Sequence, residues 1–433
     1  MGRRALRVFG SGRRLGRLVL DRFLPGWLLN VRALLEEHGQ VAVTIAALAL
    51  GLLASHLRST PYNNDTLLAG AFLNGRVWID WPGAGTSDAL LWNGHRYVIE
   101  GPAPAVLMIP LVLVAGKAAN QTTLAIVLAA FAVAATWDFL QRLGTGLAAR
   151  LWLTLFFFAG TTLWWCAQLG DVWFLAHCSA VAFTMLALRE LAAEKPRGWV
   201  VALGAAVAFE SRFTLVLALP FYAYFLWRGG IAPEASAGPA EQRIARARAF
   251  CATLVPVAAF WAWYNLARWG VWYDLGYVEF FHRDPWGQPA GSPFRLSYLP
   301  YQIFSFFLQP PVLVEWHQQA MWPIFKVDVN GVALTWSSPA LALAFAARAS
   351  RAYLRALWGL IALVALPSFL YYLNGWFQYG MRHALDFEPY LLVLMVLAAR
   401  EGIPRWGKAL IAFSCLMSVW GIWYWNAFYR TGN

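Results

Sequence analysis

Long apolar segments recur along the whole chain and constrain its fold more than any motif does. Of its 433 residues, 60% are hydrophobic and 13% are charged, about half the charged fraction of a soluble domain, which is roughly 25%. A helix needs about 20 apolar residues to cross a bilayer, where every backbone polar group must be paired internally. The composition therefore predicts an all-α polytopic membrane protein without a separate soluble domain.

Segments of that length predict about 11–12 transmembrane helices in a single domain over residues 40–433. The predicted spans are residues 40–57, 122–142, 148–169, 171–192, 198–210, 213–228, 249–267, 333–349, 355–373, 386–399 and 407–427. The apolar segment 102–120 carries three prolines. We expect it to be re-entrant or to lie at the membrane surface, packed on protein, because a full span here would move every later loop to the other side.

The net charge of +12 could indicate nucleic-acid binding, but its distribution indicates membrane topology instead. Arginine clusters in residues 3–22, 243–248 and 348–355, and basic segments between spans face the cytoplasm. Residues 1–39 are therefore predicted to be a basic cytoplasmic segment, and 58–121 and 268–332 to be the long outer loops. We expect contact with membrane lipids, anionic ones included, and no nucleic-acid partner.

The first outer loop places an acid, Asp65, soon after the first span. Leu67, Leu68, Ala71 and Phe72 recur at helical spacing, which puts Asp65 near the start of a short interfacial helix. The helix dipole at that position should lower the pKa of Asp65 and favour the carboxylate. Two interpretations remain open, a helix cap or a base that acts on a substrate at headgroup depth.

We make simpler predictions for the other polar residues of the predicted outer face. Asn93-Gly94 is a tight-turn signal that predicts a small hairpin. Asp171 begins a span on the outer side, where it could cap the helix, bind an acceptor or orient Asp65. His177 does not share a helix face with Asp171, and we predict that it is a hydrogen-bonding core residue. The four cysteines lack metal-ligand spacing, so we predict no metal or cofactor, with a divalent cation beside Asp65 left open.

A set of short motifs follows in order along the chain. After the first span come Asp65, Ala71-Phe72-Leu73-Asn74-Gly75-Arg76, Gly94-His95-Arg96-Tyr97 and Pro102-Ala103-Pro104, then Gly170-Asp171-Val172-Trp173, Phe209-Glu210-Ser211-Arg212, Asn265-Leu266-Ala267-Arg268 and Gln378-Tyr379-Gly380-Met381-Arg382-His383. The ordered set, over most of the chain from about residue 40 to residue 400, resembles the GT-C superfamily of membrane glycosyltransferases. The nearest branch is that of the protein O-mannosyltransferases and lipid A aminoarabinose transferases with their many bacterial relatives.

The resemblance implies a GT-C-like fold and an inverting glycosyltransferase on the outer, periplasmic face of a bacterial inner membrane. The sugar donor would be a polyprenyl-phosphate sugar, and an acceptor hydroxyl would attack its anomeric carbon. Asp65 would be the general base that takes the hydroxyl proton, because a hydroxyl is a poor nucleophile until a positioned base removes its proton. Asp171 would be the second acid of the site.

The resemblance also implies a cationic site for the phosphate of the donor. Arg212, Arg382 and Arg268 are the candidates, since a guanidinium can bind phosphate oxygens in bidentate fashion. Contacts to the acceptor or within the loop would come from Asn64, Glu100, Tyr97 and His383.

Two positions depart from the pattern of that branch. Glu100-Gly101-Pro102 stands where the branch carries Lys-Pro-Pro, so an acid replaces a phosphate-facing cation. Asn64-Asp65 stands where the branch carries an Asp-Glu pair. The phosphate site is therefore expected among the later arginines.

Two other classes of function remain open. A transporter or flippase for a lipid-linked sugar would show inverted repeats, and none is visible in the sequence. An O-antigen ligase or polymerase would use the same substrates and rely on one large late loop, for which 268–332 is the candidate. The sugar, the acceptor, the lipid length and the oligomeric state are not predicted by the sequence.

Overall fold

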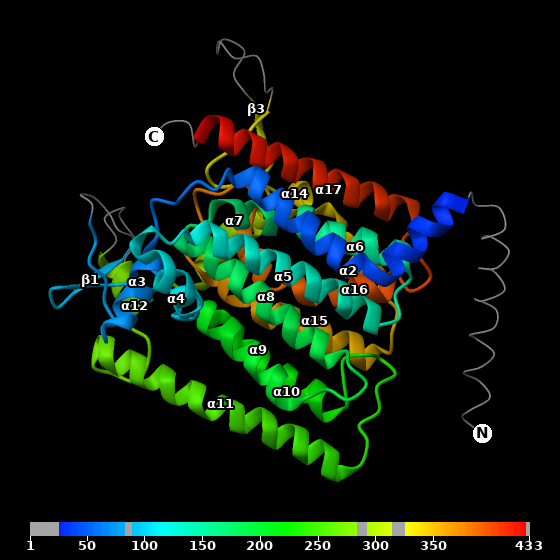
Figure 1. The fold of residues 1–433 in the computed structure, drawn as a ribbon, viewed down its shortest axis with the longest axis horizontal. Helices are drawn as coiled ribbons and strands as arrows, with labels where there is room; N and C mark the ends of the chain where they lie inside the picture. The colour runs from blue at the N-terminus through cyan, green and yellow to red at the C-terminus, as the bar shows by residue number, and fades with distance from the viewer. Residues whose placement is uncertain (1–25, 83–88, 284–291, 314–324, 430–433) are drawn as a thin grey trace.

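A computed structural model describes residues 26–82, 89–283, 292–313 and 325–429, and most of these are helical (Figure 1). The α-helices are α2 (Gly26–Ser55), α3 (Asn64–Leu73), α4 (Ala103–Ala115), α5 (Gln121–Arg142), α6 (Leu147–Ala159), α7 (Leu163–Leu169), α8 (Val172–Leu191), α9 (Gly198–Ser211), α10 (Leu219–Trp227), α11 (Ala240–Trp269), α12 (Gly276–Arg283), α13 (Leu299–Phe307), α14 (Leu334–Ser337), α15 (Arg351–Leu370), α16 (Glu388–Ala398) and α17 (Arg405–Tyr424). The 3-10 helices are η1 (Gly116–Ala118), η2 (Phe213–Ala218), η3 (Leu296–Tyr298), η4 (Pro339–Ala346) and η5 (Arg382–Asp386), and η6 (Trp425–Tyr429) is a π-helix. The strands are β1 (Leu90–Trp92), β2 (His95–Tyr97), β3 (Val312–Leu313) and β4 (Phe325–Lys326).

The predicted all-α membrane protein is confirmed, but the predicted number of full-length spans is too high. Six described helices, α2, α5, α8, α11, α15 and α17 with η6, are long and apolar enough to cross a membrane. A seventh span results if α6 and α7, which are bent by 46°, count as one. The segments predicted as spans 198–210, 213–228 and 386–399 are shorter apolar helices. The 14-residue α9 rises only about 21 Å, less than the roughly 30 Å of a bilayer core.

The short helices have local causes. Pro220 and Pro389 lie in the first turns of α10 and α16, where a proline can begin a helix but cannot continue one that came before. Arg212 separates α9 from η2 in an extended conformation, with φ −141° and ψ 102°. Ser338 separates α14 from η4 within the predicted span 333–349.

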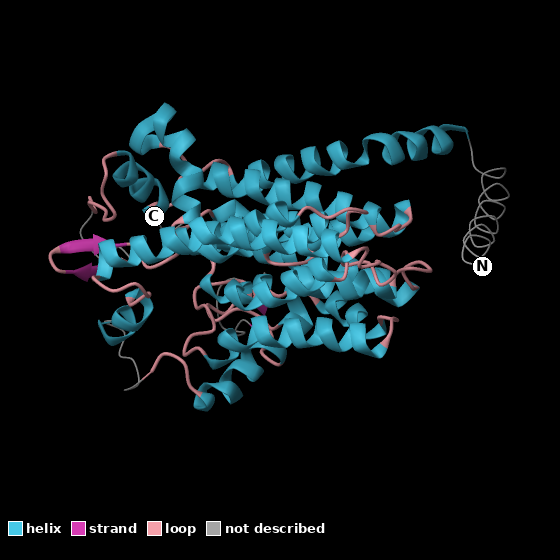
Figure 2. Ribbon diagram, turned by 90° about the horizontal axis from the view of Figure 1, so that it is seen from below, coloured by secondary structure: helices cyan, strands magenta, loops and turns pink. Residues whose placement is uncertain are grey.

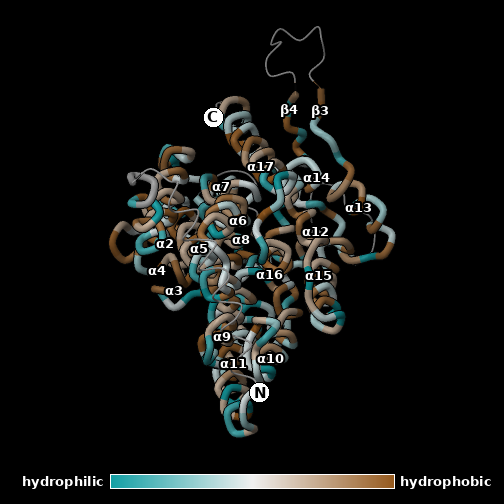
Figure 3. The backbone as a smooth tube through the Cα atoms, turned by 90° about the vertical axis from the view of Figure 1, so that its right-hand side faces the viewer, coloured by the Kyte–Doolittle hydropathy of each residue, from teal (hydrophilic) through white to brown (hydrophobic). Residues whose placement is uncertain are grey.

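Helix α8 forms the centre of the bundle, and α11 lies at its outside. The most apolar window of α8 is 78% buried and that of α11 only 17%. Val255, Trp263 and Leu266 of α11 are exposed, and apolar segments predominate within the bundle (Figure 3). An apolar helix face exposed in this way fits a lipid-facing surface.

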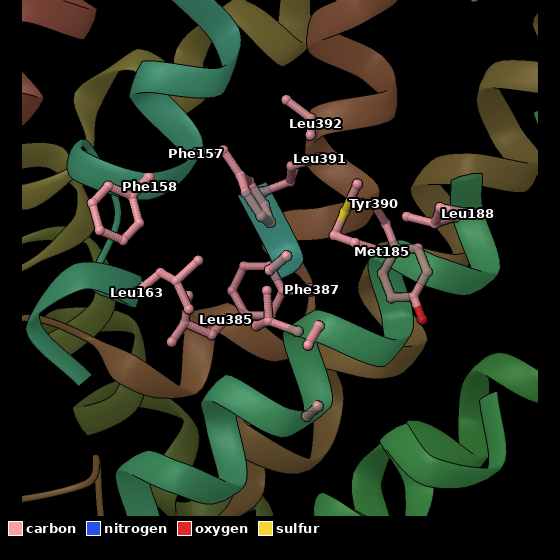
Figure 4. Packing of buried hydrophobic residues seen from close by; sticks show 14 of the residues in the cluster. Phe157, Phe158, Leu163, Met185, Leu188, Leu385, Phe387, Tyr390, Leu391 and Leu392 are labelled. Atoms are coloured by element: carbon pink, nitrogen blue, oxygen red, sulfur yellow. The ribbon is translucent and has the colours of Figure 1, made fainter. Parts of the chain in front are cut away.

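A tightly packed apolar core joins α6, α7, α8 and α16 to η5 (Figure 4). Leu385 and Phe387 belong to this core and are at most 4% exposed. Tyr390 packs beside them, and its hydroxyl lies 2.8 Å from that of Tyr222. The residue between Leu385 and Phe387 is Asp386, so the core fixes the position of an acid.

One end of the bundle carries the short elements of residues 58–121, the predicted first outer loop, at the left of Figure 1. The predicted hairpin is confirmed: β1 and β2 pair antiparallel, and Asn93 and Gly94 take φ values of +47° and +82°, as a tight turn of this kind requires. The predicted short helix at Asp65 is also confirmed as α3. Figure 2 shows the hairpin at the end opposite the start of α2.

Three predicted segments, residues 1–39, 102–120 and 268–332, contain helices or strands that the structure describes. Helix α2 begins at Gly26, so the predicted division between residues 39 and 40 falls inside a continuous helix; residues 1–25 lie outside the described part. The segment 102–120 forms α4 and η1, a short apolar helix that buries Met108 and Val112 against the bundle. The described parts of loop 268–332 contain α12, η3, α13, β3 and β4, and the rest of that loop is not described.

Candidate functional site

Buried charged residues gather toward the end of the bundle that carries the hairpin. They come from α3, α8, α11 and η5 and from the end of α9. Electrostatic interactions connect them through Tyr264, Asp274 and Tyr277. We use the name polar layer for Asp65, His177, Glu210, Arg212, Arg268, Arg382, His383 and Asp386.

Asp65 is fully buried in the first turn of α3. Asn63 holds the N-cap position, and the N–H groups of Asp65 and Thr66 donate to Oε1 of Gln121 at 3.1 Å and 3.3 Å. Neither carboxylate oxygen of Asp65 has a hydrogen-bond partner within the described ranges. The interpretation of Asp65 as a helix cap is therefore wrong, and its buried carboxyl group lacks a structural role that would satisfy it.

The surroundings of Asp65 raise its pKa well above the ordinary value, because burial penalises the charged form. The helix position had predicted a lowered pKa. A helix dipole contributes about 0.3–1 kcal/mol at an exposed site, and Gln121 already occupies the N–H groups of the first turn, so the burial effect is the larger one. An acid with a raised pKa is suited to proton transfer near neutral pH.

Gln121 joins the helix ends nearest Asp65. Its amide nitrogen donates to the carbonyl oxygens of Tyr62 at 3.3 Å and Gly170 at 2.7 Å. Gly170 has a φ of +68°, and a Cβ atom there would lie 2.4 Å from Cα of Thr122. Only glycine permits this approach, which sets the start of α8 directly against the start of α5.

Asp171 precedes α8 at the N-cap position, but its side chain makes no capping hydrogen bond. Its carboxylate accepts a hydrogen bond from the hydroxyl of Thr60, and the Thr60 oxygen accepts one from the N–H of Tyr62 at 3.0 Å. Because the carboxyl oxygens of Asp65 have no hydrogen-bond partner among described residues, Asp171 does not orient Asp65 directly. Asp171 instead helps to hold the loop that leads into α3.

Arg268 is enclosed at the end of α11. Its guanidinium donates to the carbonyl oxygen of Val98 at 3.1 Å and to Oδ1 of Asn265 at 2.9 Å, and lies 3.3 Å from Oδ1 of Asp274. It also lies over the ring of Tyr264, 3.9 Å from the centroid. Its side chain has no exposed surface. Arg268 therefore ties the hairpin to α11.

Glu210 lies in the last turn of α9, against the chain segment that follows the hairpin. A Cβ atom at Gly101 would lie 1.8 Å from the carbonyl oxygen of Glu210, so glycine is required where the two backbones meet. The Glu210 residue is 5% exposed, and its two carboxyl oxygens are without a hydrogen bond in the part of the chain that the structure describes. It interacts electrostatically with Arg268.

Arg212 and Asp386 form a buried bidentate ion pair. Nε and Nη2 of Arg212 donate to Oδ1 and Oδ2 of Asp386 at 3.2 Å and 2.9 Å, and the hydroxyl of Thr214 donates to Oδ2 at 2.9 Å. Burial alone would raise the pKa of Asp386, but Arg212 beside it holds that pKa well below the ordinary value. The predicted phosphate ligand Arg212 thus has one edge already bound to a carboxylate.

The two histidines of the polar layer lie against this pair. Nδ1 of His177 is 3.4 Å from Oδ1 of Asp386 without meeting hydrogen-bond geometry, so the predicted core position is confirmed and the predicted hydrogen bond is not. The ring of His383 lies 5.6 Å from that of His177. Burial and the charges of Arg212 and Arg382 lower the pKa of His383 well below its ordinary value, which keeps the His383 ring neutral at pH 7.

Arg382 belongs to the polar layer, and the remaining predicted site residues are Asn64, Tyr97 and Glu100. Arg382 is 7% exposed, donates from Nη1 to the carbonyl oxygen of Trp376 at 3.0 Å and lies over the ring of Phe174. Asn64 is buried next to Asp65, and Tyr97 packs its ring 5.1 Å from that of Trp269. Glu100 is 4% exposed and interacts electrostatically with Arg212 and Tyr277.

Four residues were not predicted from the sequence: Gln121, Tyr264, Asp386 and Glu388. Asp386 and Glu388 stand among Ala384, Leu385, Phe387 and Pro389, and an acid next to an apolar helix is a signal that could have identified them. Gln121 and Tyr264 offered no such signal, because their roles depend on which helix ends meet.

A separate apolar groove opens between α2, α5 and α6. It has a volume of about 300 Å³. Its lining comprises Val43, Ala46, Ala47, Leu50, Val133, Leu151, Trp152, Thr154, Leu155 and Phe158. None of these residues belongs to the polar layer, so the groove is not part of the site around Asp65. Across the described residues, no group of three or more His, Cys, Asp or Glu side chains could hold a metal ion.

Comparison with protein-family models, with curated proteins and with solved structures found no match for this chain. Its function is therefore inferred from the residues of the polar layer and their geometry.

Proposed function

We propose that the chain is an inverting membrane glycosyltransferase that uses a polyprenyl-phosphate sugar, as the resemblance to the GT-C superfamily implies. One observation supports this proposal most directly: Asp65 is fully buried with both carboxyl oxygens unpartnered in the described structure. Burying an unsatisfied polar group costs about 1–3 kcal/mol. A group maintained at that cost without a structural contact is a candidate for chemistry.

In the proposed reaction Asp65 is the general base. The acceptor hydroxyl forms a bond from its oxygen to the anomeric carbon, its proton passes to the Asp65 carboxylate, and the bond to the phosphate oxygen breaks. A single displacement of this kind inverts the anomeric configuration. The raised pKa of Asp65, caused by burial, brings the base nearer to neutral pH, where proton transfer is most effective.

The departing polyprenyl phosphate needs a cation to stabilise its charge. Among the three candidate arginines, Arg268 is the least available, because Nη1 already donates to Val98 and Nη2 to Asn265 beside Asp274. The Arg212 side chain is 15% exposed, and Asp386 binds it through Nε and Nη2, so Nη1 lies on the edge away from the carboxylate. Arg212, with Arg382, whose charge also acts on His383, is therefore the favoured phosphate ligand.

Replacing Asp65 by asparagine tests the base. The full chain in lipid nanodiscs would be supplied with polyprenyl-phosphate hexoses and candidate acceptors, and both sugar transfer and release of polyprenyl phosphate would be measured. We expect D65N to lose about 100-fold or more in rate, the range of general-base catalysis. The matched control is Asp80→Asn in the same outer loop, whose carboxylate is 70% exposed and pairs with Arg76 at 2.8 Å. Equal activity of D65N and D80N would exclude Asp65 as the base.

A transporter of lipid-linked sugars is the second candidate, and one observation favours it. Glu210 and Glu388 are buried acids whose carboxyl oxygens lack partners in the described ranges, and such acids occur in proton relays of transporters. Proteoliposomes separate the two functions. A transporter would move the lipid-linked sugar between leaflets and leave it intact, whereas a transferase would consume it. The ligase or polymerase alternative depends on loop 268–332, which is described only in part.

A further inference from the structure

Asp65 and Tyr264 face the same region between α3 and the end of α11. Asp65 and Phe72 are seven residues apart on α3, so they project from nearly the same helix face. The ring of Phe72 lies 6.0 Å from that of Tyr264 in an edge contact. Asp65 and Tyr264 also interact electrostatically. The face of α3 that carries Asp65 is therefore turned toward Tyr264.

Glu210 brings a second acid to the same region. It interacts electrostatically with Tyr264 and with Arg268, and the Arg268 guanidinium lies 3.9 Å from the centroid of the Tyr264 ring. The close approach of Gly101 to the Glu210 carbonyl oxygen holds this end of α9 under the segment that follows the hairpin. Three helices, α3, α9 and α11, thus meet around one phenol.

Hydrogen-bonding capacity is unused at all of these side chains. The carboxyl oxygens of Asp65 and Glu210, the hydroxyl of Tyr264 and Nε of Arg268 are buried without a partner, as far as the described residues extend. Asp65 and Tyr264 are 0% exposed, and Glu210 and Arg268 are at most 5% exposed. Buried polar groups are nearly always satisfied in native proteins, so a cluster of unsatisfied ones indicates a ligand that supplies the missing bonds.

The chemistry of the cluster selects the kind of ligand. Two carboxyl groups would repel a phosphate. Among the described residues, these acids do not belong to a group of three or more His, Cys, Asp or Glu side chains that could hold a metal ion. A hydroxyl group both donates and accepts. It can donate to Asp65 or Glu210 and accept from the Tyr264 hydroxyl or from Nε of Arg268.

We propose that Asp65, Glu210 and Tyr264 form a subsite that binds the hydroxyl groups of a sugar ring. This inference rests on the proposed function, because it assigns a substrate class to the site that contains the base. The phosphate of a donor would lie away from the two acids, on the side of Arg212 and Arg382. Glu210 and Tyr264 act here as binding residues, and Asp65 alone transfers the proton.

Sugar binding is measured without turnover, so its outcome does not depend on whether the chain transfers sugars. The probes are methyl glycosides of glucose, mannose and galactose, titrated into the full chain in nanodiscs and followed by saturation-transfer NMR. Glu210→Gln and Tyr264→Phe change hydrogen bonding and leave side-chain volume nearly unchanged. The matched controls are Glu388→Gln, another buried acid with unpartnered oxygens, and Tyr222→Phe, whose hydroxyl pairs with that of Tyr390.

We expect E210Q and Y264F each to weaken binding of the preferred glycoside about tenfold, the upper end of the effect of losing one hydrogen bond, with E388Q and Y222F unchanged. Deoxy analogues of that glycoside should weaken binding to the wild type by a similar factor, which tests the same bonds without altering the protein. Failure of the wild type to bind any of the glycosides would overturn the proposal. So would equal binding by wild type, E210Q and Y264F, or an equal loss in E388Q.

Turnover then identifies the bound sugar. If the subsite holds the donor, E210Q and Y264F raise KM for the polyprenyl-phosphate sugar; if it holds the acceptor, they raise KM for the acceptor. In both cases kcat stays near the wild-type value, whereas D65N loses kcat. A D65N variant that transfers sugar normally would disprove the base while leaving the binding result to decide the subsite.

Discussion

Replacing Asp386 by asparagine should destabilise the fold by about 3 kcal/mol. The substitution removes the carboxylate that accepts from Nε and Nη2 of Arg212 and from the hydroxyl of Thr214, at 3.2, 2.9 and 2.9 Å. Breaking a buried ion pair by removing one partner costs about 3–5 kcal/mol, because the other charge is left without compensation. The low end applies here, since the Arg212 side chain is 15% exposed and water can solvate part of it.

Chemical unfolding in mild detergent, followed by tryptophan fluorescence, measures this loss. The matched comparison is the double variant Asp386→Leu with Arg212→Met, which removes both charges and keeps similar volumes. Replacing both members of a buried pair by apolar groups is often neutral or stabilising, so the double variant should be more stable than D386N alone. A D386N protein within about 0.5 kcal/mol of wild type, the usual effect of a surface substitution, would refute the reasoning.

The pH dependence of stability is an independent test of the ion pair between Arg212 and Asp386. Arg212 holds the pKa of Asp386 well below its ordinary value in the folded protein, whereas the unfolded chain has a pKa of about 3.9 for aspartate. The stabilisation is therefore fully present above about pH 4 and is lost as pH falls toward the folded pKa. The difference between wild type and D386N should shrink as pH falls below about 4, and a constant difference would contradict the assigned cause.

Three further outcomes follow from the residues around Asp65. Gly101→Ala should destabilise the protein by about 1–3 kcal/mol through overpacking, because its Cβ would lie 1.8 Å from the Glu210 carbonyl oxygen. The control is Gly70→Ala, whose Cβ has open space and should not destabilise the protein. Thermal unfolding compares the two variants. Gln121→Ala should lower the free energy of unfolding by about 1 kcal/mol, as loss of a helix cap does. It should also lower activity, because Oε1 of Gln121 accepts a hydrogen bond from the Asp65 N–H. Unfolding and transfer assays measure the two effects, and unchanged values would contradict them. Burial raises the pKa of Asp65 well above the usual aspartate value of about 3.9. The rate of sugar transfer should therefore rise with pH through that raised pKa. A pH–rate profile whose acid limb lies at about pH 4 would exclude Asp65 as the base.

Patterns that depend on neighbouring residues were predictable from the sequence. Apolar segments indicated the helices, Asn93-Gly94 indicated the hairpin, and the spacing of apolar residues after Asp65 indicated α3; the structure has all three. Counting spans by hydrophobicity failed where a helix is apolar but short. Segments such as α9 and α16 end at a polar break or begin at a proline, and hydrophobicity alone does not measure their length.

The candidate site was predictable only in part, because charge and burial act over long sequence separations. Asp65 was recognised as an acid at a helix start, and its pKa direction was wrong because the sequence does not show that it is fully buried. Arg212 was recognised as a cation at a break between helices. Its partner Asp386 lies 174 residues further along the chain, and no local pattern connects the two.

The structure separates the buried acids of the polar layer into two kinds. Asp386 is paired with Arg212, and Leu385 and Phe387 on either side hold it in the apolar core, so its charge stabilises the fold. Asp65 and Glu210 are buried without pairing in the described structure, so their burial opposes folding. Substitution of a paired acid should therefore reduce stability first, and activity only as a consequence. Substitution of an unpaired acid should reduce binding or catalysis and leave stability unchanged or improved. Measuring stability and activity on the same set of variants tests this division directly, because a purely structural polar layer would make both properties change together at all three acids.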